Sequence, residues 1–210
     1  MHDLRIVHGG LKGVNILINK DQQACIADFG LTTITGVAAH APTKASRTSS
    51  VSVGTLMSFT AGGTYRWMSP ELLDPEWFGM LESEGNRPTR QSDCYALGMV
   101  IYEVGVHVNE LCHERLTNDA QVLCGHQPFF EIQSDVLVMN AIVGGDRPKK
   151  PERAMHLGFS DELWRVVERC WLEDRGARPD VEEILRCLNG SSLSWSLRDL
   201  GQGIRLTIQT

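Results

Sequence analysis

The chain of 210 residues lacks the cysteine patterns that mark a zinc site or a disulfide framework. It contains no C-x-x-C pair, and its six cysteines are scattered along the sequence, at Cys25, Cys94, Cys112, Cys124, Cys170 and Cys187. Free, scattered cysteines are typical of a reducing compartment. The sequence therefore excludes the small disulfide-stapled domains and the common zinc modules.

The sequence also lacks a run of lysine or arginine and a long apolar segment. A net charge of -6 argues against a general nucleic-acid binder. The N-terminus, MHDLRIVHGG, has no apolar signal core, and the most apolar stretch, Tyr95–Val106, is short and interrupted by Glu103. We therefore expect a soluble, cytoplasmic protein that binds neither nucleic acid nor membrane.

The composition that is present, 42% hydrophobic and 22% charged, is ordinary for a globular protein with one sizeable core. The most specific pattern is HGGLKGVNILINKDQQACIADFG, at 8–30. Its apolar runs at 16–18 and 24–27 flank a turn rich in Asn and Asp, which predicts a β hairpin. A hairpin brings its two ends to one edge, so we expect Asn15 and Asp28 to face each other.

These end residues have a chemistry in common. An amide oxygen from Asn15 and a carboxylate from Asp28 are hard ligands of the kind that suit Mg²⁺, which takes few protein ligands and completes its shell with phosphate and water. Lys12 adds a positive charge on the same side. The sequence therefore predicts a site for a metal and phosphate at this edge.

The same stretch resembles the catalytic loop and DFG element of protein kinases, whose pattern is H-R-D-L-x-x-x-N followed by D-F-G. Two positions depart from that pattern. Gly9 stands where arginine is usual, and Gly10 stands where the catalytic aspartate is expected. A DFG tripeptide alone is a weak signal, but the ordered set is specific; its matching residues are His8, Leu11, Asn15, Asp28, Phe29 and Gly30.

The resemblance implies ATP and Mg²⁺ as cofactors, with Asn15 and Asp28 holding the metal and Lys12 offsetting phosphate charge. It gives structural roles to His8, Phe29 and Gly30. The family places a glycine-rich loop, a strand lysine and a helix glutamate upstream, and none of them is in this sequence. We therefore expect the N-lobe to be absent, Met1 to lie within the domain, and ATP binding to be weak or absent.

The segment from 31 to 70 is rich in Thr, Ser, Ala and Gly. One interpretation is a loop that cannot bury apolar area. The other is an activation segment with regulatory phosphosites. Kinases of that kind commonly read the phosphate with the H-R-D arginine, so Gly9 disfavours phosphate-dependent ordering.

The sequence GTYRWMSPE at 63–71 resembles the G-T-x-R-W-M-x-P-E form of the kinase A-P-E motif, which is common in tyrosine-kinase-like (TKL) serine/threonine kinases. The resemblance implies that Thr64 reaches Lys12 and the catalytic aspartate position. It also implies a buried pair between Glu71 and Arg178. The alternative is that these two are unrelated surface charges.

Two further segments predict helices of the same domain. SDCYALG at 92–98 resembles the start of the central kinase helix, in which Asp93 accepts backbone hydrogen bonds from the catalytic loop. Near the C-terminus, Ser160 is a suitable N-cap for a helix ending near 171. An apolar stripe predicts a last helix from 180 to Gly190, with tryptophans 164 and 171 in the core.

Residues 105–122 interrupt the resemblance, because the family would run from YEV directly into a segment like LCGHQPFF at 123–130. Two interpretations are an extended surface loop and a translated intron. The spacing of His107, Cys112 and His113 fits no familiar metal site. We therefore expect an insertion without a metal.

Together these patterns predict a mainly α fold: a protein kinase C-lobe over 1–190, built as a helical bundle with one short β hairpin at the active-site edge, and a tail at 191–210. As an enzyme, it would transfer the γ-phosphoryl of Mg-ATP to serine or threonine of a protein substrate. As a pseudokinase or truncated gene product, it would at most bind a protein partner. Gly10 favours impaired catalysis, because glycine cannot orient a substrate hydroxyl or accept its proton.

Overall fold

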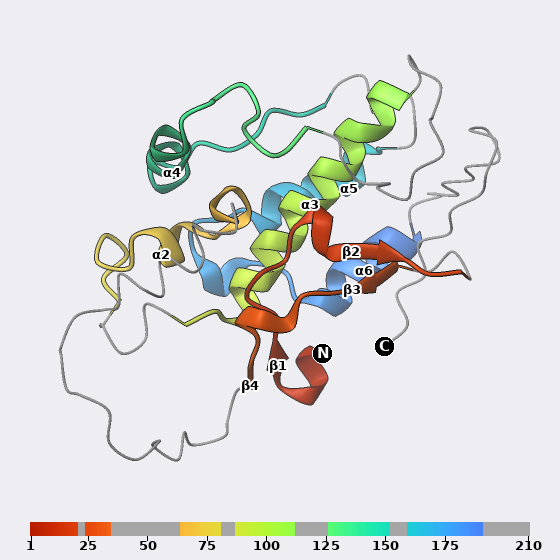
Figure 1. Ribbon diagram of the computed structural model, residues 1–210, viewed down its shortest axis with the longest axis horizontal. Coiled ribbons are helices and arrows are strands. Elements are labelled where there is room, and N and C mark those ends of the chain that lie inside the picture. Colours follow the sequence, from red (N-terminus) through yellow and green to blue (C-terminus); the bar gives the residue numbers. More distant parts are fainter. Residues whose placement is uncertain (21–23, 35–63, 81–86, 112–125, 152–158, 191–210) are drawn as a thin grey trace.

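The computed structural model describes residues 1–20, 24–34, 64–80, 87–111, 126–151 and 159–190. Within these ranges the chain is mainly helical, with two sheets of two strands each. The long helix α3 runs through the middle of the molecule, and the strands lie on one side of it (Figure 1). This arrangement agrees with the predicted mainly helical fold and its short hairpin, but the pair β1–β4 was not predicted.

The strands form two antiparallel pairs. β1, Ile6–Val7, pairs with β4, Thr33–Ile34, and β2, Ile16–Ile18, pairs with β3, Ala24–Ile26. In the second pair, the first residue of β2 lies opposite the last residue of β3. The predicted hairpin is therefore present, and its register brings the loop before β2 to the same edge as the loop after β3.

The helices are short apart from α3. They are α2 Pro70–Leu73, α3 Arg90–Leu111, α4 Asp135–Val143, α5 Asp161–Cys170 and α6 Val181–Gly190, with 3₁₀ turns η1 His2–Leu4, η2 Gly13–Asn15, η3 Phe29–Leu31, η4 Tyr65–Trp67 and η6 Arg175–Ala177. The predicted start of α5 is confirmed, because the Ser160 hydroxyl accepts the backbone N–H of Leu163 at 3.2 Å.

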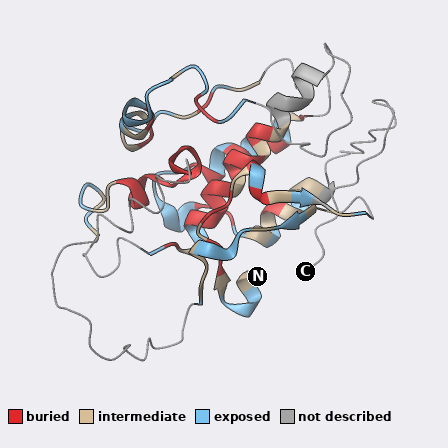
Figure 2. Cartoon of the chain, viewed as in Figure 1, coloured by how far each residue is buried: buried red, intermediate tan, exposed pale blue. Residues whose placement is uncertain are grey.

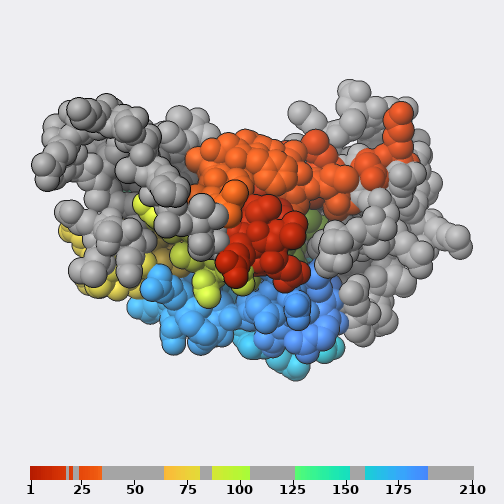
Figure 3. Space-filling view, turned by 90° about the horizontal axis from the view of Figure 1, so that it is seen from below, coloured from red at the N-terminus to blue at the C-terminus, as the bar shows by residue number. Residues whose placement is uncertain are grey.

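The core lies between α3 and α5. Tyr95 and Met99 on α3 and Val167 and Cys170 on α5 are fully buried, and Figure 2 shows buried residues along α3. The predicted core position of Trp171 is also confirmed, because its ring meets Trp164 edge to face at 5.7 Å. Figure 3 shows the N-terminal segments, red and orange, on one face beside the blue C-terminal segments.

Helix α3 continues to Leu111 and so includes the first seven residues of the predicted insertion. Residues 106–111 contain no proline or glycine that would end the helix. Residues 112–122, most of the segment from 31 to 70 and the tail lie outside the described residues, so their interpretations stay predictions. Among the helices that the structure does describe, none has the length and apolar character needed to cross a membrane.

Candidate functional site

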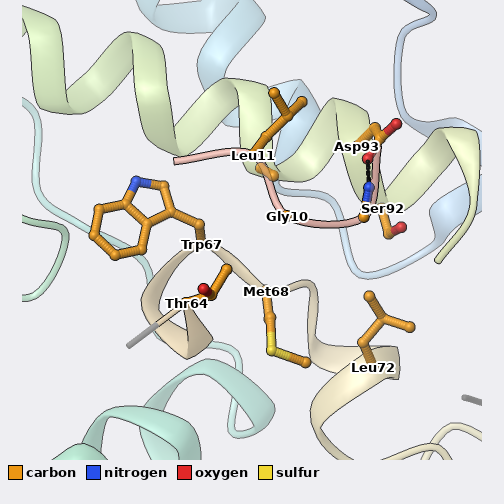
Figure 4. Close-up of a pocket in the computed structure, with 10 residues that line it drawn as sticks. Gly10, Leu11, Thr64, Trp67, Met68, Leu72, Ser92 and Asp93 are labelled. Carbon is orange, nitrogen blue, oxygen red and sulfur yellow. Dashed lines mark hydrogen bonds between the residues drawn. The ribbon is translucent and has the colours of Figure 1, made fainter. Parts of the chain in front are cut away.

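The loop that contains the two glycines is tied to the first turn of α3. Asp93 is buried, and its carboxylate accepts the backbone N–H groups of His8 at 2.8 Å and Gly9 at 2.9 Å. The ring Nε2 of His2 lies 3.0 Å from the same carboxylate. Figure 4 shows the contact from Asp93 to this loop. Asp93 therefore fixes the loop backbone to α3, and both of its carboxylate oxygens accept hydrogen bonds from the loop.

His8 joins this loop to the strand that leads to Asp28. The buried ring accepts the N–H of Gly10 through Nδ1 at 3.1 Å, so Nε2 carries the proton and donates to the carbonyl of Ala27 at 3.1 Å. The ring also lies 5.4 Å from the ring of Phe29, centroid to centroid. His8 thus sets the spacing between the loop and the residues on either side of Asp28.

Asn15 and Asp28 lie at the ends of the hairpin. The side-chain NH₂ of Asn15 donates to the carbonyl of Gly10 at 2.9 Å, and its backbone carbonyl accepts the N–H of Ala27 at 2.8 Å. Asp28 has a left-handed backbone, with φ 62°, and its exposed carboxylate accepts the N–H of Gly30 at 3.3 Å.

This donor set fits Mg²⁺. Because the NH₂ group of Asn15 is engaged, its side-chain oxygen is the atom left to face a cation, and Asp28 adds carboxylate oxygens. The described part of the chain holds no cluster of three or more His, Cys, Asp or Glu side chains suited to a metal. A cation at this edge would therefore depend on phosphate and water for the rest of its shell.

The two glycines of the loop differ in the space available for a side chain. Gly9 has φ +75°, and a Cβ there would lie 2.8 Å from the carbonyl oxygen of Leu31 and 2.8 Å from Pro88 Cγ. An arginine at this position would be strained. A Cβ at Gly10 would lie 3.2 Å from Leu31 Cδ1, the mobile end of a flexible side chain. A Cβ at Gly10 therefore needs only a small shift of the Leu31 side chain, in contrast to one at Gly9.

A small cavity of about 10 Å³, room for one water, lies beside Gly10. The loop passes between α3 and the segment that carries Thr64 and Trp67 (Figure 4). On the same side, Lys12 Nζ donates to Thr64 Oγ1 at 3.2 Å. Asp93 is the one carboxylate lining this cavity among the described residues, and it is committed to the loop backbone.

Glu71 and Arg178 form a buried two-bond ion pair. Arg178 donates through NH1 and NH2 to the two carboxylate oxygens of Glu71, each at 2.7 Å, and through Nε to the carbonyl of Leu172 at 2.8 Å. Burial raises the pKa of Glu71, but the hydrogen bonds and charge of Arg178 outweigh burial and leave that pKa below its ordinary value. The pair therefore joins α2 to the chain just before α6.

Sequence reasoning missed a second buried arginine. Arg66 is 2% exposed and donates to the carbonyls of Pro128 at 2.9 Å, Phe129 at 2.7 Å and Ile132 at 2.8 Å. It fastens the segment before α2 to the loop before α4. Arg66 belongs to the GTYRWMSPE motif, but no pattern in the sequence indicates that its partners are backbone carbonyls.

Sequence reasoning also missed Glu103, which joins three parts of the site. Its Oε2 accepts the backbone N–H of Gly13 at 3.1 Å and the indole N–H of Trp67 at 2.9 Å. The side chain is buried, and burial outweighs both hydrogen bonds and raises the pKa of Glu103 to about 7. The available signal was a single acidic residue within the apolar stretch 95–106.

We expect the free energy of unfolding to fall as pH rises through the pKa of Glu103. Folding raises the pKa of Glu103 from 4.5 to about 7, so the folded state holds the carboxyl proton more tightly than the unfolded state does. This proton binding stabilises the fold fully below about pH 4.5, and the stabilisation is lost as the pH rises through 7. The loss amounts to about 3 kcal/mol. Denaturant unfolding across this pH range should show the loss in the wild type, relative to Glu103→Gln, whose amide oxygen keeps both acceptor contacts. Equal pH profiles for the two proteins would contradict it.

Comparison with known proteins agrees with this geometry. A sequence model of the protein kinase domain matches residues 1–187. The chain is 24% identical over 189 residues to the serine/threonine-protein kinase STY17 of Arabidopsis thaliana, covering 90% of this chain and 24% of that protein. It is 24% identical over 188 residues to the serine/threonine/tyrosine-protein kinase HT1 of the same plant, covering 90% of this chain and 35% of HT1.

A third relative comes from an animal. Activin receptor type-1 of Gallus gallus is 27% identical over 187 residues, which cover 87% of this chain and 32% of the receptor. The chain therefore spans between 24% and 35% of the length of these three relatives.

Proposed function

Because the chain belongs to the protein kinase family, we propose that it forms the C-lobe of a TKL-type serine/threonine kinase and does not transfer phosphate by itself. Its role under this proposal is that of a pseudokinase module that binds protein partners. The observation that carries the proposal is Gly10. A glycine there offers no carboxylate to orient a substrate hydroxyl or to accept its proton.

The described carboxylates near the Gly10 loop have other contacts or another proposed role. Asp93 accepts the N–H groups of His8 and Gly9, and Glu103 is buried against Gly13 and Trp67. Asp28 lies at the hairpin edge, where we propose that its charge faces a cation. Because these carboxylates already have other contacts, the chain is more consistent with the loss of a general base than with its replacement by a neighbouring residue.

The exposed apolar side chains at the hairpin edge support the assignment as a C-lobe. Exposed apolar side chains that gather in one region of a surface mark a site of contact with another part of a protein. Each is between 38% and 61% exposed; Val14, Leu17, Ile26 and Phe29 lie in or beside the hairpin, and Ile34 lies on β4. An upper lobe placed over the hairpin would bury them.

A second candidate function is an active serine/threonine kinase, assembled when this lobe meets an upper lobe. The contact between Lys12 and Thr64 favours it, because it keeps a positive charge beside the Gly10 loop. Bound Mg-ATP would supply the phosphoryl group, and Asn15, Asp28 and Lys12 would hold its metal and phosphates. Gly10 remains the objection to this alternative.

We expect this chain to bind Mg-ATP with a dissociation constant weaker than about 1 mM. Under the proposed function, this lobe offers the nucleotide only Asn15, Asp28 and Lys12, and these few polar groups contact the metal and phosphates but not the adenine. Calorimetry of the chain with Mg-ATP measures the affinity, with Asp28→Ala as the matched control. Micromolar binding that Asp28→Ala abolishes would contradict the proposal and favour the active-kinase alternative.

A further inference from the structure

Helix α4 has too many apolar residues for the surface it occupies. Seven of its nine residues, DVLVMNAIV, are apolar. Val138 and Ile142 are fully buried, which accounts for one face of the helix. Val136 and Leu137 are 64% and 58% exposed. A surface helix usually confines its apolar residues to the stripe that faces the core, so these two side chains need another explanation.

The loop before α4 presents a third apolar group. Phe130 is 40% exposed, and its ring stacks on the ring of His126 at 4.3 Å. Its neighbour Phe129 is buried, and the carbonyls of Phe129 and Ile132 are held by Arg66. The loop backbone is therefore fixed on both sides of Phe130. A surface fixed in advance loses little conformational freedom when a partner binds.

Two exposed carboxylates stand next to these apolar groups in the chain. Glu131 directly follows Phe130, and Asp135 directly precedes Val136. Glu131 is exposed, and the Asp135 side chain is 57% exposed although it lies 3.7 Å from buried Arg66. An apolar centre with a charged rim is the usual anatomy of a protein interface. The sign of this rim favours a partner that carries positive charge.

We propose that this α4 surface docks a protein segment in which large apolar side chains stand next to lysine or arginine. The surface consists of His126, Phe130, Glu131, Asp135, Val136 and Leu137. It lies away from the β2–β3 hairpin (Figure 1), and α4 turns exposed residues outward (Figure 2). The proposal goes beyond the proposed function, because it holds whether or not the lobe transfers phosphate.

Charge favours a basic partner over a second copy of this chain. Two copies would bring like-charged rims together, and each chain carries a net charge of -6. A basic segment would instead pair with Glu131 and Asp135 while its apolar side chains cover Val136 and Leu137. A partner of opposite charge is therefore the occupant that the surface fits.

The test is selection of binders from a library of random displayed peptides against the wild-type chain, followed by affinity measurement of the enriched peptides. We expect enrichment of peptides that combine Lys or Arg with Leu, Phe or Trp. The double variant Val136→Ser with Leu137→Ser should weaken their binding by about tenfold or more. Glu131→Lys should weaken it and reduce its salt dependence. Because the altered side chains are exposed, these variants should melt like the wild type.

Matched controls place equivalent changes elsewhere on the surface. Leu4→Ser removes a side chain that is 72% exposed, and Glu76→Lys reverses an exposed charge; neither should alter binding. The proposal is overturned if nothing is enriched, if the peptides lack basic residues, or if the controls weaken binding as much as the α4 variants. It is also overturned if sedimentation shows a dimer that the double variant abolishes, or if a segment of this chain from outside the described residues already covers the surface.

Discussion

Replacing Arg178 with alanine should lower the free energy of unfolding by about 3–5 kcal/mol. The substitution removes two hydrogen bonds to the Glu71 carboxylate and leaves that carboxylate buried without its counter-charge. It also frees the carbonyl of Leu172 and removes the guanidinium that lies 5.2 Å from the Tyr95 ring centroid. Since folded proteins are stable by only about 5–15 kcal/mol, this loss is a large share of the total.

The chain offers a matched control for that measurement. Arg169 pairs with Glu183, but both side chains of this pair are partly exposed, so Arg169→Ala should cost about 1 kcal/mol or less. Urea unfolding of the two variants compares a buried pair with a surface pair of the same chemistry. Equal losses would mean that Glu71 and Arg178 do not hold α2 to the C-terminal helices.

The same pair is a useful case of what sequence can predict. Glu71 and Arg178 are 107 positions apart, and only the likeness to kinase motifs linked them. The hairpin, by contrast, followed from two apolar runs that flank a turn rich in Asn and Asp, and the strands pair as expected. The α5 start followed from Ser160, because N-capping is a local contact between neighbouring residues.

The missed features depend on tertiary contacts that no local pattern encodes. Glu103 stood out only as a charge in an apolar run, and nothing in the sequence indicated that Gly13 and Trp67 would be its donors. The sequence also did not predict the left-handed backbone of Gly9, which is the reason an arginine would be strained at that position. The extension of α3 to Leu111 was missed because the sequence was compared with shorter kinase segments at that point.

The proposed loss of catalysis has two parts. Gly10 offers no substrate-orienting carboxylate, and under the proposed function this lobe contributes only Asn15, Asp28 and Lys12 to a nucleotide site. Phosphoryl transfer depends mainly on positioning and electrostatics, and loss of a general base alone typically costs about 10²–10⁴-fold in rate. Restoring either feature alone should therefore leave little or no turnover. Gly10→Asp is a usable test, because the one tight contact of the added Cβ is with the end of the Leu31 side chain, at 3.2 Å.

The most direct measurement is incorporation of radiolabelled phosphate into a generic serine/threonine substrate by four proteins: this chain, its Gly10→Asp variant, the chain joined to an upper lobe from a TKL-type kinase, and that fusion carrying Gly10→Asp. Asp28→Ala in the last protein serves as the blank. We predict incorporation well above the blank only for the fusion that carries Gly10→Asp. A fusion that retains Gly10 and turns over as fast as the one with aspartate would contradict the claim that this position separates enzyme from pseudokinase.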